Sequence, residues 1–131
     1  QTEALIYLAH IYLRLENRPF DALAYSKKLI DRYPKNSKFA ELYIENLIAV
    51  KDYRQGSQLL MRQLQLDRAY YRISALFLEA RIHWEQNGDA ELAKASLNRC
   101  IDLVNLHRTN EEYKGKAKIL IEKIDESKAR L

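Results

Sequence analysis

Residues that break regular structure are rare in this sequence of 131 residues, which contains only three Gly and two Pro. So few breakers leave little room for the many turns of an all-β fold. The one cysteine, Cys100, cannot form an internal disulfide, which excludes a small disulfide-stapled domain. No apolar run approaches the roughly 18 residues that a transmembrane helix needs. These absences favour a helical domain held together by an ordinary core.

The charged residues are balanced and interleaved. There are 22 basic and 18 acidic residues, and the net charge is +4. Because no long basic block occurs, binding to nucleic acid or to an anionic membrane is not indicated. The chain has no signal peptide, opens at Gln1 and is helical in pattern from Thr2. We therefore expect it to be a piece of a longer protein, whose compartment a missing signal does not decide.

Apolar residues recur at spacings of three and four along the whole chain, and this predicts seven helices and no strand. The first predicted helix runs from about Thr2 to Glu16. The second opens at Pro19 and ends near Arg32, because the residue before Pro34 resists the helical region. Short connections between the segments predict antiparallel hairpins.

Residues that favour helix ends stand between these segments. Ser37 is the expected N-cap of the third helix. Gly88 is suited to a left-handed helix stop, and Asp89 to the N-cap that follows it. Two further pairs have the spacing of a capping box: Asp52 with Gln55, and Thr109 with Glu112.

The strongest pattern in the sequence is an internal repeat. Ala22, Gly56 and Ala93, all small, follow one another at steps of 34 and 37 residues. The same steps relate two further sets: Ser26, Leu60 and Leu97, and Leu13, Leu47 and Trp84. A period near 34 built from two helices resembles the tetratricopeptide repeat. The series Leu5, Leu8, Ala9 and Tyr12 resembles the large–large–small–aromatic pattern of that family's leading helix, and Pro34 its closing proline.

Three departures accompany the resemblance, and one is that the second hairpin lacks a closing proline. The turn of the first hairpin has one extra residue, and Tyr43 or Ile44 occupies a position that the family usually keeps small. The resemblance implies one all-α domain over 1–131, a right-handed superhelical stack of about three hairpins and a C-terminal capping helix. The expected hairpins cover about 2–34, 37–66 and 67–107, and the final helix about 109–129.

By the same resemblance, the function is that of a non-catalytic scaffold that binds a protein, as a peptide or a partner helix, in a concave groove lined by leading helices. The candidate contact residues are His10, Arg14, Glu41, Glu45, Tyr71, Leu78, Ile82 and Glu85. One alternative is a structural segment that packs on flanking repeats and self-associates through its exposed ends. Another is an RNA-binding helical repeat, against which the interleaved charge argues.

Signs of catalysis or metal binding are missing from the sequence. His10, His83 and His107 have no partner at ligand spacing, and the three glycines form no phosphate loop. We therefore expect no enzyme activity, no metal and no cofactor. Arg32-Tyr33-Pro34 followed by Ser37 looks like repeats of bacterial cell-envelope proteins, which favours a bacterial periplasm or envelope over the cytoplasm.

Overall fold

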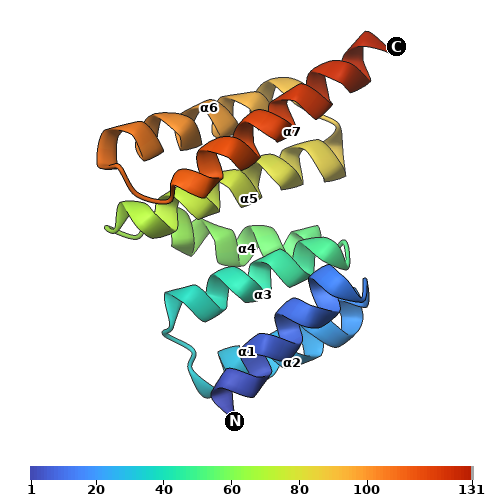
Figure 1. Ribbon diagram of the computed structural model, residues 1–131, viewed down its shortest axis with the longest axis vertical. Coiled ribbons are helices and arrows are strands. Elements are labelled where there is room, and N and C mark those ends of the chain that lie inside the picture. Colours follow the sequence, from blue (N-terminus) through green and yellow to red (C-terminus); the bar gives the residue numbers. More distant parts are fainter. Residues whose placement is uncertain (131) are drawn as a thin grey trace. The chain divides into compact units, whose positions relative to one another are not determined.

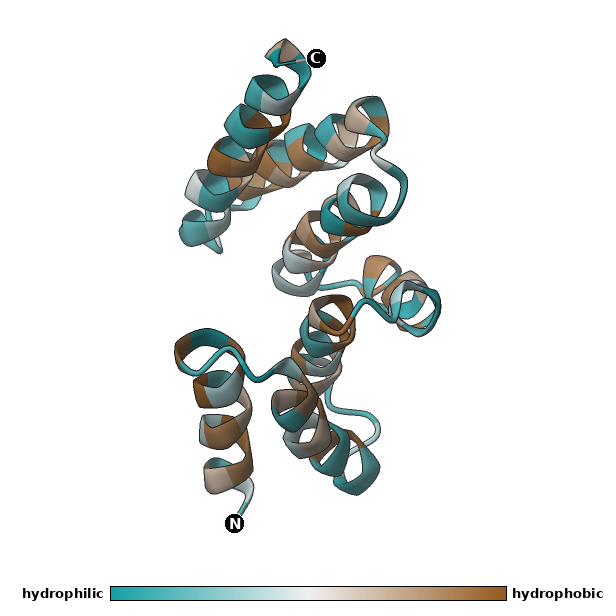
Figure 2. Ribbon diagram, turned by 90° about the vertical axis from the view of Figure 1, so that its right-hand side faces the viewer, coloured by the Kyte–Doolittle hydropathy of each residue, from teal (hydrophilic) through white to brown (hydrophobic). Residues whose placement is uncertain are grey.

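The protein is all-helical. The computed structural model describes residues 1–130, which form seven α-helices and no strand, so the predicted all-α class with seven helices is confirmed for these residues (Figure 1). The helices are α1 (Thr2–His10), α2 (Pro19–Arg32), α3 (Ser37–Ala49), α4 (Tyr53–Leu64), α5 (Ala69–Asn87), α6 (Ala90–His107) and α7 (Glu111–Ala129). The predicted bounds of α2 match the observed ones. Each helix in Figure 2 carries both hydrophilic and hydrophobic residues, as amphipathic helices do.

The helices form two compact units. The N-terminal unit covers Gln1–Leu59, and the C-terminal unit covers residues 60–130 of the described chain. In the N-terminal unit α1 packs on α2, and α2 on α3. In the C-terminal unit α5 packs on α6, α6 on α7, and α7 also contacts α5. Helix α4 begins in one unit and ends in the other.

A wide helical turn continues α1. Residues Ile11–Leu15 are π-helical, and the Glu16 N–H donates to the Ile11 carbonyl oxygen, five residues earlier, at 3.1 Å. A π-turn holds one more residue than an α-turn. It lies in the hairpin for which the resemblance predicts one extra residue. Within it, the ring of Tyr12 stacks on that of Tyr25 at 5.5 Å and ties this turn to α2.

The core of the N-terminal unit combines apolar contacts with one buried polar link. Ala9, Leu29 and Leu42 meet from α1, α2 and α3. Asn46 of α3 is fully buried, and its Nδ2 donates to Ser26 Oγ at 2.7 Å and to the Ala22 carbonyl oxygen at 3.3 Å. Because buried polar groups are costly unless paired, this link fixes the contact between α2 and α3.

The turn between α5 and α6 is built as predicted. Gly88 lies in the left-handed region at φ +60°, and Asp89 Oδ1 accepts the N–H of Leu92 at 3.0 Å. This tight turn lays α6 antiparallel on α5. Fully buried Cys100 is a core residue of this pair, and its Sγ donates to the Ile73 carbonyl oxygen at 3.4 Å. Burial raises the pKa of its thiol to about 11.

Two predicted caps are wrong, and a third is half formed. The N-cap of α3 is Asn36, whose Oδ1 accepts from the Phe39 N–H at 3.0 Å, so Ser37 is the first helical residue. The N-cap of α7 is Asn110, not Thr109; its side chain caps nothing and instead donates to the Tyr70 carbonyl oxygen at 2.7 Å. A tertiary contact thus replaced the local cap. Asp52 does accept the Gln55 N–H, at 3.2 Å, whereas the Gln55 side chain donates to Tyr43.

Candidate partner-binding groove

A groove of about 310 Å³ lies between α5 and α7 in the C-terminal unit. Its walls are seven side chains from these two helices: Phe77, Arg81 and Glu85 of α5, and Lys116, Ile119, Leu120 and Lys123 of α7. The α5 residues follow one another at intervals of four, and the α7 residues at intervals of three, one and three. Both spacings place side chains on one face of a helix, so two helix faces form the groove.

The floor of the groove is apolar. Phe77 packs against the core of the unit, where its ring meets that of Tyr113 edge-on at 5.6 Å. Leu120 is half-buried against the same core. Ile119 is different, because 55% of it stays exposed. An exposed branched aliphatic side chain beside a buried aromatic ring offers apolar surface to a second molecule.

Cationic groups stand along the groove. The Arg81 guanidinium is held by Glu85, with Nε 2.8 Å from Oε2. Lys116 Nζ lies 4.6 Å from the centre of the Tyr113 ring and has no carboxylate partner among residues 1–130. Lys123 forms no ion pair within residues 1–130. With one of its three cationic groups neutralised, the groove has an excess of positive charge.

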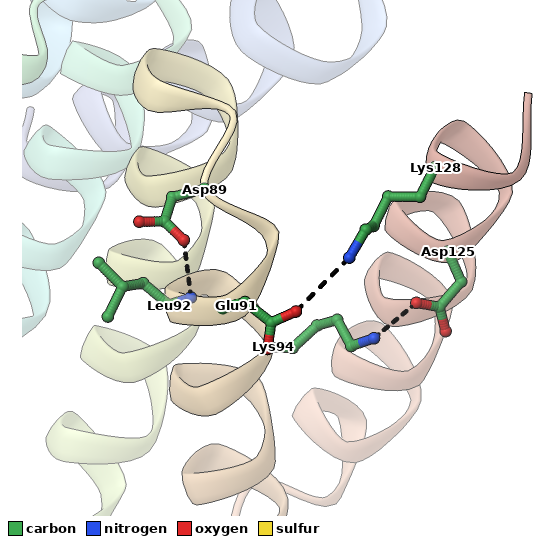
Figure 3. Close-up of polar contacts among 6 residues, drawn as sticks. All are labelled: Asp89, Glu91, Leu92, Lys94, Asp125 and Lys128. Atoms are coloured by element: carbon green, nitrogen blue, oxygen red, sulfur yellow. Dashed lines mark hydrogen bonds and ion pairs between the residues drawn. The ribbon is translucent and has the colours of Figure 1, made fainter. Parts of the chain in front are cut away.

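Contacts with α6 hold α7 in place from its other side (Figure 3). Lys94 Nζ of α6 lies 2.7 Å from Asp125 Oδ1, and Lys128 Nζ lies 3.5 Å from Glu91 Oε1. Such exposed pairs are screened by solvent and add little to stability. Beneath them, fully buried Ala117 and Ile124 pack α7 into the core. The groove wall is therefore supported by a packed core rather than by a loop.

A second hollow, of about 410 Å³, lies on another face of the C-terminal unit. Its lining is Leu64, Arg72, Leu76, Arg99, Asp102 and Leu103. Two guanidinium groups and one carboxylate line it. The α5–α7 groove is the better candidate, because its lining has three cationic groups against one carboxylate and its floor offers the exposed Ile119.

Comparison of the chain with protein-family models, with curated proteins and with solved structures gives no match. Within residues 1–130 no helix is both long and apolar enough to cross a bilayer. Nor do these residues bring three or more His, Cys, Asp or Glu side chains together in a group that could hold a metal ion. What the protein does must therefore be inferred from the groove and from the packing of its helices.

Three of the predicted contact residues come together in the N-terminal unit. The Arg14 guanidinium nitrogen lies 3.0 Å from Glu45 Oε1, which joins the π-turn to α3. His10 lies one turn before Arg14 and is half-buried, with an Nδ1 that has no hydrogen-bond partner. Burial lowers the pKa of His10, and Arg14 lowers it further, whereas Glu45 raises it. Glu41 lies one turn before Glu45 on the same helix.

The four predicted contact residues in the C-terminal unit lie in three different surroundings. Glu85 lines the α5–α7 groove. Tyr71 is half-buried at the start of α5, with its ring edge-on to Tyr70 at 5.2 Å. Leu78 and Ile82 are only 3% and 5% exposed, so both are core residues in this structure and present no free surface. The resemblance placed both residues toward a groove of leading helices, whereas Phe77 and Arg81, one position earlier on α5, line the observed groove.

The groove residues that the sequence reasoning missed lie mainly on α7. They are Phe77, Arg81, Lys116, Ile119, Leu120 and Lys123. The resemblance makes the final helix a cap and predicts no contact residue on it. A signal was nevertheless present, because Lys116, Ile119, Leu120 and Lys123 repeat at positions of one helix face.

Proposed function

We propose that this protein is a non-catalytic scaffold of tetratricopeptide type that binds a segment of a partner protein in the α5–α7 groove. The observation that carries the proposal is Ile119, which remains 55% exposed on an apolar floor between two helices. Apolar anchors in preformed grooves supply most of the energy of helix and peptide recognition. Because the groove is already formed by packed helices, only the partner loses much conformational entropy when it binds.

The packing within each unit supports the repeat assignment. In the C-terminal unit α5 contacts both its own partner α6 and the next leading helix α7. This is the neighbour relation of stacked helical hairpins, in which successive leading helices line one face. Ala22 and Ala93, at the small position of the repeat, are both fully buried. Small residues there let the second helix of a hairpin approach the first closely.

The proposal is tested by selecting binders from a displayed library of random peptides and measuring their affinity for two variants. Ile119→Ser removes the apolar anchor, and Leu106→Ser removes a comparably exposed aliphatic side chain of α6 that lies outside the groove. Fully burying a side chain of this size contributes about 1.5–3 kcal/mol, and about half of Ile119 is still exposed, so a partner gains roughly 0.8–1.6 kcal/mol by covering it. Ile119→Ser should therefore weaken binding about four- to fifteenfold, and Leu106→Ser should leave it unchanged. Failure to enrich any binder, or equal weakening by both variants, would contradict the proposal.

An alternative function is structural, and exposed apolar side chains of the N-terminal unit favour it. Tyr7, Leu15 and Phe20 are 69%, 80% and 72% exposed. These side chains offer surface for packing against another helical hairpin or a second copy of the chain. Analytical ultracentrifugation distinguishes the two functions. Self-association that is abolished by Tyr7→Ser with Phe20→Ser, and unaffected by Ile119→Ser, would support the structural role.

A further inference from the structure

The charges beside the apolar anchor are arranged in a way that restricts what the groove can bind. Lys116 and Lys123 line the groove at either side of the pair Ile119 and Leu120 on α7. The two lysines are seven residues apart, which is about 10 Å along a helix axis. Along α7 the groove therefore presents a positive charge, then an apolar pair, then a second positive charge.

Neither lysine is neutralised by a carboxylate of the part of the chain that the structure describes. Lys123 has no ion pair within residues 1–130, and Lys116 meets only the face of the Tyr113 ring. The one carboxylate that lines the groove, Glu85, is committed to Arg81 at 2.8 Å. Other lysines of this unit do find carboxylates, since Lys94 and Lys128 pair with Asp125 and Glu91. The positive ends of the groove are therefore left for a partner of opposite charge.

From this arrangement we propose that the partner is an acidic amphipathic helix with two carboxylate side chains seven residues apart that frame an apolar pair. The inference rests on the proposed function and specifies its ligand. A helix lying alongside α7 repeats the same 10 Å interval, about two turns, so each carboxylate reaches one lysine while the apolar pair covers Ile119. An extended segment fits less well, because its side chains alternate between faces with a period of two.

Electrostatic complementarity of this kind determines which partner is accepted more than how tightly it binds. A helix with lysines at the two outer positions would place like charges opposite Lys116 and Lys123 and would be rejected. A helix with neutral outer positions would still bury its apolar pair and would bind more weakly. Added salt should weaken the binding of the acidic partner, since salt screens the attraction between exposed charges.

The test uses a displayed helical scaffold that is randomised at the four positions of this pattern. Selection on the wild-type protein should enrich Asp and Glu at the two outer positions and apolar residues at the inner pair. Selection on the double variant Lys116→Glu and Lys123→Glu should enrich Lys and Arg at the outer positions. The matched control, Lys118→Glu with Lys35→Glu, changes the net charge equally at exposed positions outside the groove and should keep the acidic preference.

The affinity of a selected binder is then measured for the wild-type protein and for both double variants. An acidic binder should lose about tenfold or more in affinity for the groove double variant and little for the control. Enrichment of the apolar pair without any acidic preference would overturn the inference while leaving the proposed function standing. Failure of the scaffold and of random peptides alike to bind would overturn both. An acidic preference that survives Lys116→Glu and Lys123→Glu would place the recognition elsewhere and also refute the inference.

Discussion

The buried link between α2 and α3 allows a quantitative test of the fold. Asn46 Nδ2 donates at 2.7 Å to Ser26 Oγ, which in turn donates to the Leu23 carbonyl oxygen at 3.1 Å. The change Ser26→Ala removes the shorter bond of a fully buried amide. An amide group left partly unpaired costs about 1–3 kcal/mol. We expect Ser26→Ala to reduce the free energy of unfolding by that amount.

Repeating Ser26→Ala in a protein that already carries Asn46→Leu isolates the hydrogen bond between Ser26 and Asn46. Asn46→Leu removes both donated hydrogen bonds, worth together about 2 kcal/mol, and also removes a buried Oδ1 that has no partner. Because the loss and the relief are similar in size, Asn46→Leu should change stability by no more than about 1 kcal/mol. In that background the Ser26 hydroxyl keeps only its bond within α2, and Ser26→Ala should cost less than about 1 kcal/mol.

The measurement is urea denaturation of the four proteins followed by far-ultraviolet circular dichroism, with hydrogen exchange of α2 and α3 as a local readout. The coupling energy between Ser26 and Asn46 should be about 1–2 kcal/mol, in the range found for residues that share a hydrogen bond. Equal costs of Ser26→Ala in both backgrounds, within about 0.3 kcal/mol, would refute the view that this link joins the two helices.

Three further predictions concern single residues. Gly88→Ala should destabilise the protein by about 1 kcal/mol, because Gly88 lies at φ +60°, although a Cβ would meet no atom within 4 Å. Gly115→Ala, in the second turn of α7 and equally open, should stabilise it by about 0.5–1 kcal/mol in urea denaturation. Cys100 should react with a thiol reagent only on unfolding, since it is fully buried and its pKa is raised to about 11; rapid reaction of the native protein would contradict this. The lowered pKa of His10 means that the unfolded chain binds more protons near pH 6.5, so stability should fall as the pH is lowered through that value, and His10→Gln should flatten this dependence in urea titrations at several pH values.

Local chemistry predicted the helices well because it decides where they stop. Pro19 and Pro34 restrict the backbone around α2, and Gly88 supplies the left-handed residue that ends α5. The one-residue error at the start of α3 has a local cause too, since Asn36 and Ser37 are both good capping residues. The error at α7 is of another kind. Asn110 donates to a carbonyl oxygen 40 residues away, and no local pattern contains such a contact.

The wide turn after α1 depends both on the local sequence and on a tertiary contact. The sequence shows one residue too many in the first hairpin, and this surplus was expected in the loop. The structure has a π-helical turn at Ile11–Leu15, where the N–H of Glu16 bonds five residues back. Such a turn holds one more residue than an α-turn. The stack of Tyr12 on Tyr25 ties this turn to α2, and that packing is invisible in a single sequence.

The groove could have been found from α7 by a simple geometric argument. Ile119, Leu120 and Ile121 are consecutive, and successive helical residues point about 100° apart, so the three together span about 200°. A helix with one buried stripe cannot cover so wide an apolar arc. One of the three must therefore face away from the core, and the structure shows that it is Ile119, at 55% exposure. Lysines one turn before and one turn after it keep this surface hydrated in the free protein and opposite in charge to an acidic partner. An apolar residue that cannot be buried by its own helix is thus a stronger indication of a contact site than the position of a residue in a repeat.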